Sequence, residues 1–467
     1  MAKQYSFAVP FIVGCAQFMH QFDGTAIATA LPSMAATLHE TPLRLNLAIS
    51  CYLLSLAVFV PISGWLADRY GARQIFMLAI TIFTVSSVLC GLSHNLLELV
   101  LARIVQGLGG AMMTPVGRVI VAKSVPRSGL VKAMNYITIP GMLAPVLGPS
   151  VGGLIVTYFS WPWVFFVNLP IGVAGVLLVR AYVPDLARER VASLDSMGFV
   201  FSSVALAGFV FGFESMGRGL LPAWLVVCLL TVGVVCGFLY LIHSRRVAEP
   251  IVDLGLMRFR SFSASITGGS LFYVTTTAVV FLLAVLFQVG FGYSAFHAGL
   301  ILLGTATGSV VSRAAFPPAL KLFGFRRLLL INVLVISSFL FCCGLFRAQT
   351  PLVLLLGFLF FGGLARSMLY ASIQSLSYAE MPRPLMSRAT SFAAMVQQFM
   401  QSFGVGLVAL AVHFSLVLHG RVDLTVGDLK YGFWLLSALS FLSVLVFLRL
   451  PASAGAALEG RGSKAAQ

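Results

Sequence analysis

Long apolar runs separated by short polar loops make up most of the chain. A membrane-spanning helix needs about 20 predominantly apolar residues, and fourteen segments of this kind follow one another. The pattern therefore predicts an all-α membrane protein. The expected spans lie near residues 8–32, 45–67, 75–93, 97–118, 134–158, 163–183, 197–214, 223–243, 263–290, 297–313, 327–346, 351–373, 390–417 and 432–449.

Basic residues are unevenly divided between the two sets of loops. One set includes Lys3, Arg73, Lys132, Arg260 and Lys464 among many others. The opposite loops hold only Arg44, Arg218, Arg347, Arg421 and Lys430. Cytoplasmic loops carry the excess of Lys and Arg, so the basic set is expected to be cytoplasmic. An even number of spans then places both termini in the cytoplasm.

Composition supports the membrane assignment. Apolar residues make up 59% of the chain and charged residues 9%, with a mean hydropathy of +0.99, whereas a soluble domain carries about 25% charged residues. The net charge of +16 is spread over short clusters without interleaved aromatics, which argues against nucleic-acid binding. The seven cysteines show no CxxC and no Cys–His spacing, so neither a disulfide framework nor a metal site is expected.

A weak internal repeat suggests two equivalent halves. The loop after the second span contains Asp68, Gly71 and Arg73, and the matching loop of the second half has Lys321, Gly324 and Arg326 at the corresponding positions. Internal repeats that rock about a midplane site are typical of secondary transporters. The predicted division is an N-terminal six-helix bundle (1–190), two inserted helices (191–250), a C-terminal six-helix bundle (251–450) and a disordered cytoplasmic tail (451–467).

Two charged residues in the first half fall well inside predicted spans, away from the span ends. Asp23 and Arg103 are costly at membrane depth and so should be paired or face a water-filled cavity. Burial opposes ionisation of a carboxylate and a nearby arginine favours it, so this pair suits proton loading and release; the alternative is a purely structural pair. His20 lies three residues before Asp23 on the same helix face, where it would relay protons or only hydrogen-bond a neighbour.

Five motifs surround these charges. Glycines such as Gly64 allow close helix approach, and Pro149 within a small-residue face is expected to kink its helix. The motifs read DGTAIATALP at 23–32, GWLADRYGAR at 64–73, Arg103 followed by Gln106-Gly107 and Gly109-Gly110, GPSVGG at 148–153, and WPWVF at 161–165 with Asn168, Pro170 and Gly172.

With these motifs the chain resembles the major facilitator superfamily over nearly its whole length, specifically the fourteen-span drug–proton antiporters of the EmrB/QacA type and their MdtD-like members. Two positions depart from the family pattern: Ala144 stands where many relatives have glycine, and Ala28 replaces an asparagine. The resemblance implies a major facilitator fold, with two six-helix bundles plus two inserted helices, in a bacterial cytoplasmic (inner) membrane.

The resemblance also implies roles for the motif residues. Asp23, Arg103 and His20 are the proton-coupling candidates, driven by the proton gradient without a cofactor. The antiporter helix that distinguishes exporters from importers carries Gly148, Pro149, Gly152 and Gly153. A cytoplasmic latch between the halves is assigned to Gly64, Asp68, Arg69, Gly71, Arg73 and Arg118. Asp68 is expected to face a helix N-terminus or to pair with a cation such as Arg118.

Polar residues inside other spans are candidates for the substrate cavity: Gln17, Arg366, Gln374, Gln397 and Gln401. Arg366 is the one charge well inside the spans of the second half. If it faces the cavity, an anionic or metal-chelate substrate becomes plausible, because guanidinium suits carboxylate recognition.

These features favour an exporter of drugs or metabolites in exchange for protons. An exporter of an organic anion, siderophore or metal chelate is the alternative, followed by a nutrient uniporter or importer. An enzyme is disfavoured, since no nucleophile–base pair, metal-ligand set or Walker A motif is present. The expected partners are a small-molecule substrate, protons and the lipid bilayer, with a monomer as the expected unit and a periplasmic adaptor left open.

Overall fold

The computed structural model describes residues 8–40, 42–185, 193–218, 221–293, 295–419 and 425–450, and these contain helices and no strand. The elements are α1 (Ala8–Leu38), α2 (Pro42–Phe59), α3 (Ser63–Tyr70), α4 (Ala72–Gly91), α5 (Leu96–Ser124), α6 (Arg127–Tyr158), α7 (Pro162–Phe166), α8 (Asn168–Tyr182), α9 (Ser196–Arg218), α10 (Ala223–Ser244), η1 (Leu254–Arg258), α11 (Arg260–Val285), η2 (Leu286–Gly290), α12 (Ala295–Phe323), α13 (Phe325–Cys343), α14 (Leu352–Leu376), η3 (Arg383–Leu385), α15 (Met386–Leu418) and α16 (Val426–Leu448).

The helices coincide with the predicted spans. Among the described residues, eleven helices are long and apolar enough to cross a membrane, or twelve with the bent pair α2–α3. The predicted count of fourteen is consistent with this set, because α1 and α6 are themselves 31 and 32 residues long. The chain is a multi-pass membrane protein.

Two spans are less regular than their hydropathy indicates. The second predicted span is broken between α2 and α3 by a bend of 56°. Pro61 lies at the break, where its missing N–H and its ring prevent a continuous helix. The α11 span ends in a π-helical turn, η2, a form that is rare and that apolar periodicity does not predict.

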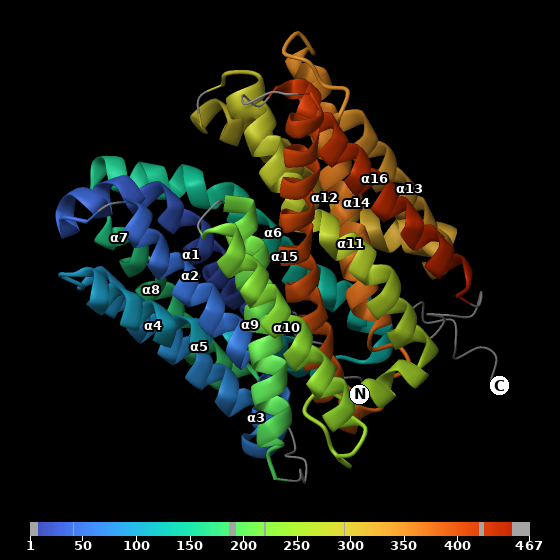
Figure 1. Ribbon diagram of the computed structural model, residues 1–467. Helices are drawn as coiled ribbons and strands as arrows, with labels where there is room; N and C mark the ends of the chain where they lie inside the picture. The colour runs from blue at the N-terminus through green and yellow to red at the C-terminus, as the bar shows by residue number, and fades with distance from the viewer. Residues whose placement is uncertain are drawn as a thin grey trace.

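The helices form two groups, which we call the N half (α1–α8) and the C half (α11–α16). In Figure 1 the N half (blue to teal) and the C half (yellow-green to red) come together at the end where α3 lies and spread apart toward the opposite end. We refer to these as the α3 end and the far end. The two ends therefore differ in how closely the halves approach.

Helix α9, the first of the two helices predicted as an insertion, packs along the boundary between the halves. Ser203 Oγ donates to the carbonyl of Val58 in α2 at 2.6 Å. On the other side, Phe209 and Phe213 of α9 contact Phe399 of α15, with ring centroids 4.8 and 6.2 Å apart. This helix thus touches both halves at once.

The predicted repeat is confirmed at two positions. Gly71 and Gly324 both have positive φ, 96° and 74°, and each precedes the first residue of a helix, α4 or α13. Two residues further on, Arg73 donates to the carbonyl of Arg180 at 2.5 Å and Arg326 to that of Leu448 at 2.6 Å. Each arginine thereby binds the end of the last helix of its own half.

Close packing of α12 on α14 depends on small residues and gives a testable prediction. A Cβ at Gly363 would lie 2.1 Å from the carbonyl oxygen of Thr305. Since that atom belongs to the backbone, Gly363→Ala should force the helices apart and cost about 1–3 kcal/mol, seen as a lower unfolding temperature in detergent. Gly357→Ala in the same helix is the control, because its Cβ would meet nothing within 4 Å. Equal stability of the two variants would contradict this packing.

Candidate functional site

The centre of the N half holds a fully buried ion pair. Asp23 of α1 and Arg103 of α5 are both 0% exposed. Arg103 Nη1 donates to Asp23 Oδ2 at 2.5 Å and to Gln106 Oε1 at 2.6 Å. The pairing predicted from sequence for these two charges is therefore present in the structure.

Neutral donors complete the surroundings of the carboxylate. Gln106 Nε2 and Asn168 Nδ2 donate to Asp23 Oδ1 at 3.0 and 3.2 Å. Asn168, at the start of α8, also donates to Ser87 Oγ of α4 at 3.0 Å. Both carboxylate oxygens are thus satisfied inside the membrane, as a buried charge requires.

The guanidinium of Arg103 also has contacts that do not involve Asp23. Arg103 lies over the ring of Tyr52, with 4.1 Å between Cζ and the ring centroid, and its Nε donates to the carbonyl of Ala48 at 3.4 Å. An arginine over an aromatic face gains a cation–π attraction that is strengthened by desolvation. Arg103 therefore keeps partners when Asp23 becomes neutral.

His20 reaches the pair indirectly. Its Nδ1 lies 2.5 Å from the hydroxyl of Tyr52, and Tyr52 in turn stacks on Arg103. The structure shows no hydrogen bond between His20 and Asp23, although the two share a helix face. Gln17, another candidate on α1, is buried against Gly141 of α6, with its Oε1 lacking a partner among the described residues.

A polar cluster joins the two halves. Arg118 of α5 donates to Tyr370 Oη of α14 at 2.9 Å and to Gln397 Oε1 of α15 at 3.1 Å. Gln374 Nε2 then reaches Gln397 Oε1 at 3.3 Å and Tyr273 Oη at 3.1 Å. Two glutamines predicted to line the cavity thus belong to a network that crosses from the N half to the C half.

The predicted latch also lies between the halves, with one correction. Asp68 Oδ1 accepts from Ser387 Oγ, in the first turn of α15, at 2.5 Å and from Lys123 Nζ at 3.1 Å. Asp68 therefore lies at the first turn of α15, where it contacts a side-chain hydroxyl, and Arg118 is not the cation of this contact. Lys123 lies five residues further along α5 and reaches Asp68, whereas Arg118 turns toward α14 and α15.

The remaining latch residues have packing roles. A Cβ at Gly64 would lie 2.5 Å from Ser391 Oγ and 2.7 Å from the carbonyl of Ser387, so only glycine allows α3 this close to α15. Gly71 has a positive φ and Arg73 binds the end of α8, as described above. Arg69 lies over the ring of Trp65, 5.6 Å from its centroid.

The antiporter motif lies in α6, where its glycines differ in importance. A Cβ at Gly148 would come 2.1 Å from Thr25 Oγ1 of α1, whereas one at Gly153 would meet nothing within 4 Å. Gly152 is buried. Pro149 lies within the helix bounds, and its side chain is outside the described part of the chain.

Arg366 of α14 differs from Arg103 in lacking a counter-ion. Its Nε is buried without a hydrogen-bond partner among the described residues, and none of their ion pairs includes it. It lies four residues before Tyr370 and so shares its helix face, the face that reaches Arg118. Gln401 lies on α15, four residues beyond Gln397, and is partly exposed.

Several residues of these networks were not predicted as site residues. Gln106 lies three residues after Arg103, a spacing that places both side chains on one face, so the helical period alone would have found it. Asn168 belongs to the motif that follows WPWVF, but neither it nor Tyr52 or Ser387 carries a local signal for its partner, because these contacts form between helices. In the described part of the chain, no group of three or more His, Cys, Asp or Glu residues is placed to hold a metal ion.

Comparison with known proteins agrees with this geometry. The family model of the Major Facilitator Superfamily matches residues 13–405. A protein named MdtD from Escherichia coli O139:H28 (strain E24377A / ETEC), provisionally assigned to multidrug resistance, is 37% identical over 447 residues, covering 94% of both chains. The protein of the same name from Klebsiella pneumoniae subsp. pneumoniae is 36% identical over 456 residues, covering 95% of both.

Solved structures share the fold at low sequence identity. The proton:xylose symporter XylE superposes with a TM-score of 0.66 at 16% identity, covering 97% of this chain and 98% of the symporter. The human organic anion transporter MFSD10 gives a TM-score of 0.64 at 15% identity, covering 94% of this chain and 99% of the other. Family match, relatives and fold agree, and the chain belongs to the major facilitator superfamily.

Proposed function

We propose that this protein exports small molecules in exchange for protons, and that it acts as a transporter rather than an enzyme. The buried Asp23–Arg103 pair is the observation that carries this proposal, supported by relatives whose name refers to multidrug resistance. A titratable carboxylate at membrane depth is costly and in transporters belongs to ion or proton pathways. The proton gradient supplies the energy, and no cofactor is needed.

Burial of the pair suits coupling to a conformational change. Neither Asp23 nor Arg103 is exposed in this structure, so a proton reaches the carboxylate only when the surrounding helices move. Protonation removes the charge that holds Arg103 Nη1, while Tyr52 and Gln106 keep the guanidinium in place. The proton and the substrate then bind in alternation, as the two halves open the site between them first to one side of the membrane and then to the other.

Asp23→Asn should abolish proton-driven efflux while the protein stays folded and inserted. Asparagine retains an oxygen that accepts from Arg103, but it cannot take up a proton. Efflux from proteoliposomes under an imposed pH gradient measures the effect, and Asp253→Asn in the loop before η1 is a matched control. Full gradient-driven transport by Asp23→Asn would place the coupling site elsewhere.

We assign the α3 end to the cytoplasm, because the loops at this end carry most of the basic residues. Both chain termini are then cytoplasmic, and the membrane is the bacterial cytoplasmic (inner) membrane. The contacts of Asp68 and Arg118 with the C half close this end, so the described state faces outward. The halves must separate here when substrate enters from the cytoplasm.

Gly64→Ala should weaken this closed state. The added methyl group would collide with the Ser387 backbone, which favours conformations open at the α3 end. Spin labels at Tyr70 and Arg383, both exposed, should report a longer distance in this variant. Gly357→Ala serves as the control, and an unchanged distance distribution in Gly64→Ala would show that the contact does not govern closure.

An organic anion or metal chelate is the second candidate substrate, and Arg366 favours it. This guanidinium is unpaired on the α14 face that turns toward the N half, as described above. The one carboxylate at the centre of the N half, Asp23, is already paired with Arg103. A carboxylate substrate would supply the missing partner of Arg366.

Arg366→Ala should lower transport of organic anions roughly tenfold or more, because hydrogen bonds to charged groups are worth about 1.5–3 kcal/mol. Transport of lipophilic cations should be unchanged or increased. Uptake of both classes into inverted vesicles gives the comparison, with Arg347→Ala in an exposed loop as control. Unchanged anion transport in Arg366→Ala would eliminate this candidate.

A further inference from the structure

A groove of about 630 Å³ lies between the start of α11 and the end of α16, at the α3 end of the C half. Its mouth carries three arginines, Arg258, Arg260 and Arg449, and its wall includes Leu442 and Leu445. The groove is thus amphipathic along its length, with charge at the membrane surface and apolar side chains toward the bilayer core.

The three arginines are exposed and have no anionic partner among the described residues. Arg258 lies over the ring of Phe259, 5.1 Å from its centroid. Arg326, by contrast, donates to the Leu448 carbonyl and so already has a partner at the end of α16. The guanidinium groups at the mouth remain available to an external anion.

The first turn of α11 adds to the positive potential at this mouth. The helix begins at Arg260, and Phe259 before it provides no side-chain cap, so the positive end of the helix dipole points to the same region. Glu380 accepts from Ser261 N at 3.1 Å and is the carboxylate bound to this turn. Asp253 caps η1 through the backbone of Gly255, and among the described residues neither Asp253 nor Glu380 forms an ion pair with the three arginines. Two carboxylates against three guanidinium groups leave the site positive.

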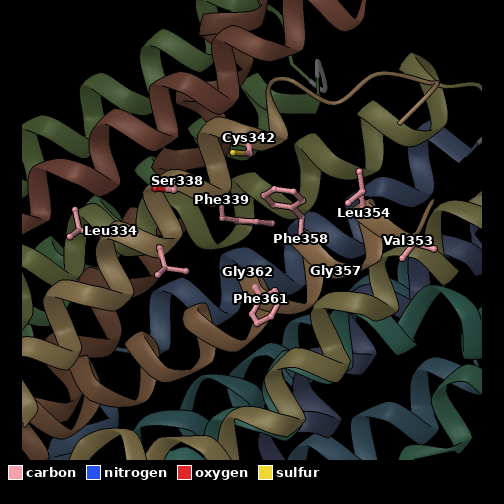
Figure 2. A pocket seen from close by; sticks show the side chains of 11 residues that line it. Leu334, Ser338, Phe339, Cys342, Val353, Leu354, Gly357, Phe358, Phe361 and Gly362 are labelled. Atoms are coloured by element: carbon pink, nitrogen blue, oxygen red, sulfur yellow. The ribbon is translucent and has the colours of Figure 1, made fainter. Parts of the chain in front are cut away.

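A second groove, without charged residues, serves as a comparison for the first. The groove between α13 and α14, about 540 Å³, is lined by apolar side chains such as Phe339, Phe358 and Phe361 and by the hydroxyl of Ser338 (Figure 2). No charged residue lines it. It offers room for hydrocarbon but no contact for a headgroup, so it would not distinguish one lipid from another.

We infer that the α11–α16 groove binds one anionic phospholipid, with its phosphate between Arg258, Arg260 and Arg449 and an acyl chain along Leu442 and Leu445. Hydrocarbon gains little by leaving other lipid tails for an apolar wall, so the headgroup charge decides which lipid binds. Basic pockets between spanning helices at the cytoplasmic side suit such headgroups. Placement in the cytoplasmic leaflet rests on the proposed orientation, whereas binding itself does not.

Native mass spectrometry of the purified protein tests this inference. Wild-type protein in mixed phosphatidylglycerol and phosphatidylcholine should retain one phosphatidylglycerol preferentially. In the variant Arg258→Gln/Arg260→Gln/Arg449→Gln, the ratio of bound phosphatidylglycerol to bound phosphatidylcholine should fall by about fivefold for each guanidinium removed. Its matched control is Arg245→Gln/Arg246→Gln/Arg383→Gln, which removes the same charge at the α3 end outside the groove and should keep the preference.

Two outcomes would overturn the inference. Equal phosphatidylglycerol preference in both triple variants would show that the groove is not the site. Displacement of the lipid by inorganic phosphate at the same concentration would show that the arginines bind a free anion. Asp23→Asn should retain the lipid, so loss of proton coupling and loss of lipid binding are distinguished by different variants.

Discussion

The buried pair of Asp23 and Arg103 is the constraint around which the N half is built. A single charge at the centre of a bilayer costs about 2.5–3.5 kcal/mol even on the most lenient scales, and a buried pair of opposite charges is tolerated only when further contacts support both groups. Gln106 of α5 and Asn168 of α8 donate hydrogen bonds to the carboxylate, and the Tyr52 ring of α2 lies against the guanidinium, whose Nη2 has no hydrogen-bond partner among the described residues. The helices of this half are therefore positioned by a polar centre as well as by apolar packing.

Contacts between the halves have a different character. Hydrogen bonds between two hydroxyls, or between a charged side chain and a neutral hydroxyl or amide, join α3 and α5 to α14 and α15, and water can replace each of them when the halves separate. The glycine at position 64 brings the two backbones close without interlocking large side chains. The aromatic contacts of α9 lie at the side of this boundary, where they keep apolar surfaces in contact.

Charge is distributed unequally between the halves. The carboxylate at the centre of the N half is neutralised by Arg103, whereas Arg366 in the C half has no partner among the described residues. At the membrane surface, Arg258, Arg260 and Arg449 likewise lack acidic neighbours in ion-pair contact. The C half therefore carries arginines without acidic partners both on its face toward the N half and at the membrane surface facing lipid, and anions of different kinds fit each.

Hydropathy and helical spacing determined much of this protein from sequence alone. They predicted the spans, the set of loops that carries most of the basic residues, and the repeat at Gly71 and Gly324. They also predicted that the two buried charges need a partner. Each of these features depends on local composition or on symmetry along the chain. Only the tertiary structure decided that Lys123 rather than Arg118 meets Asp68, that His20 binds Tyr52, and that Asn168 reaches Asp23. These partners depend on how each helix is rotated about its axis and packed against its neighbours, which the periodicity of one segment does not specify.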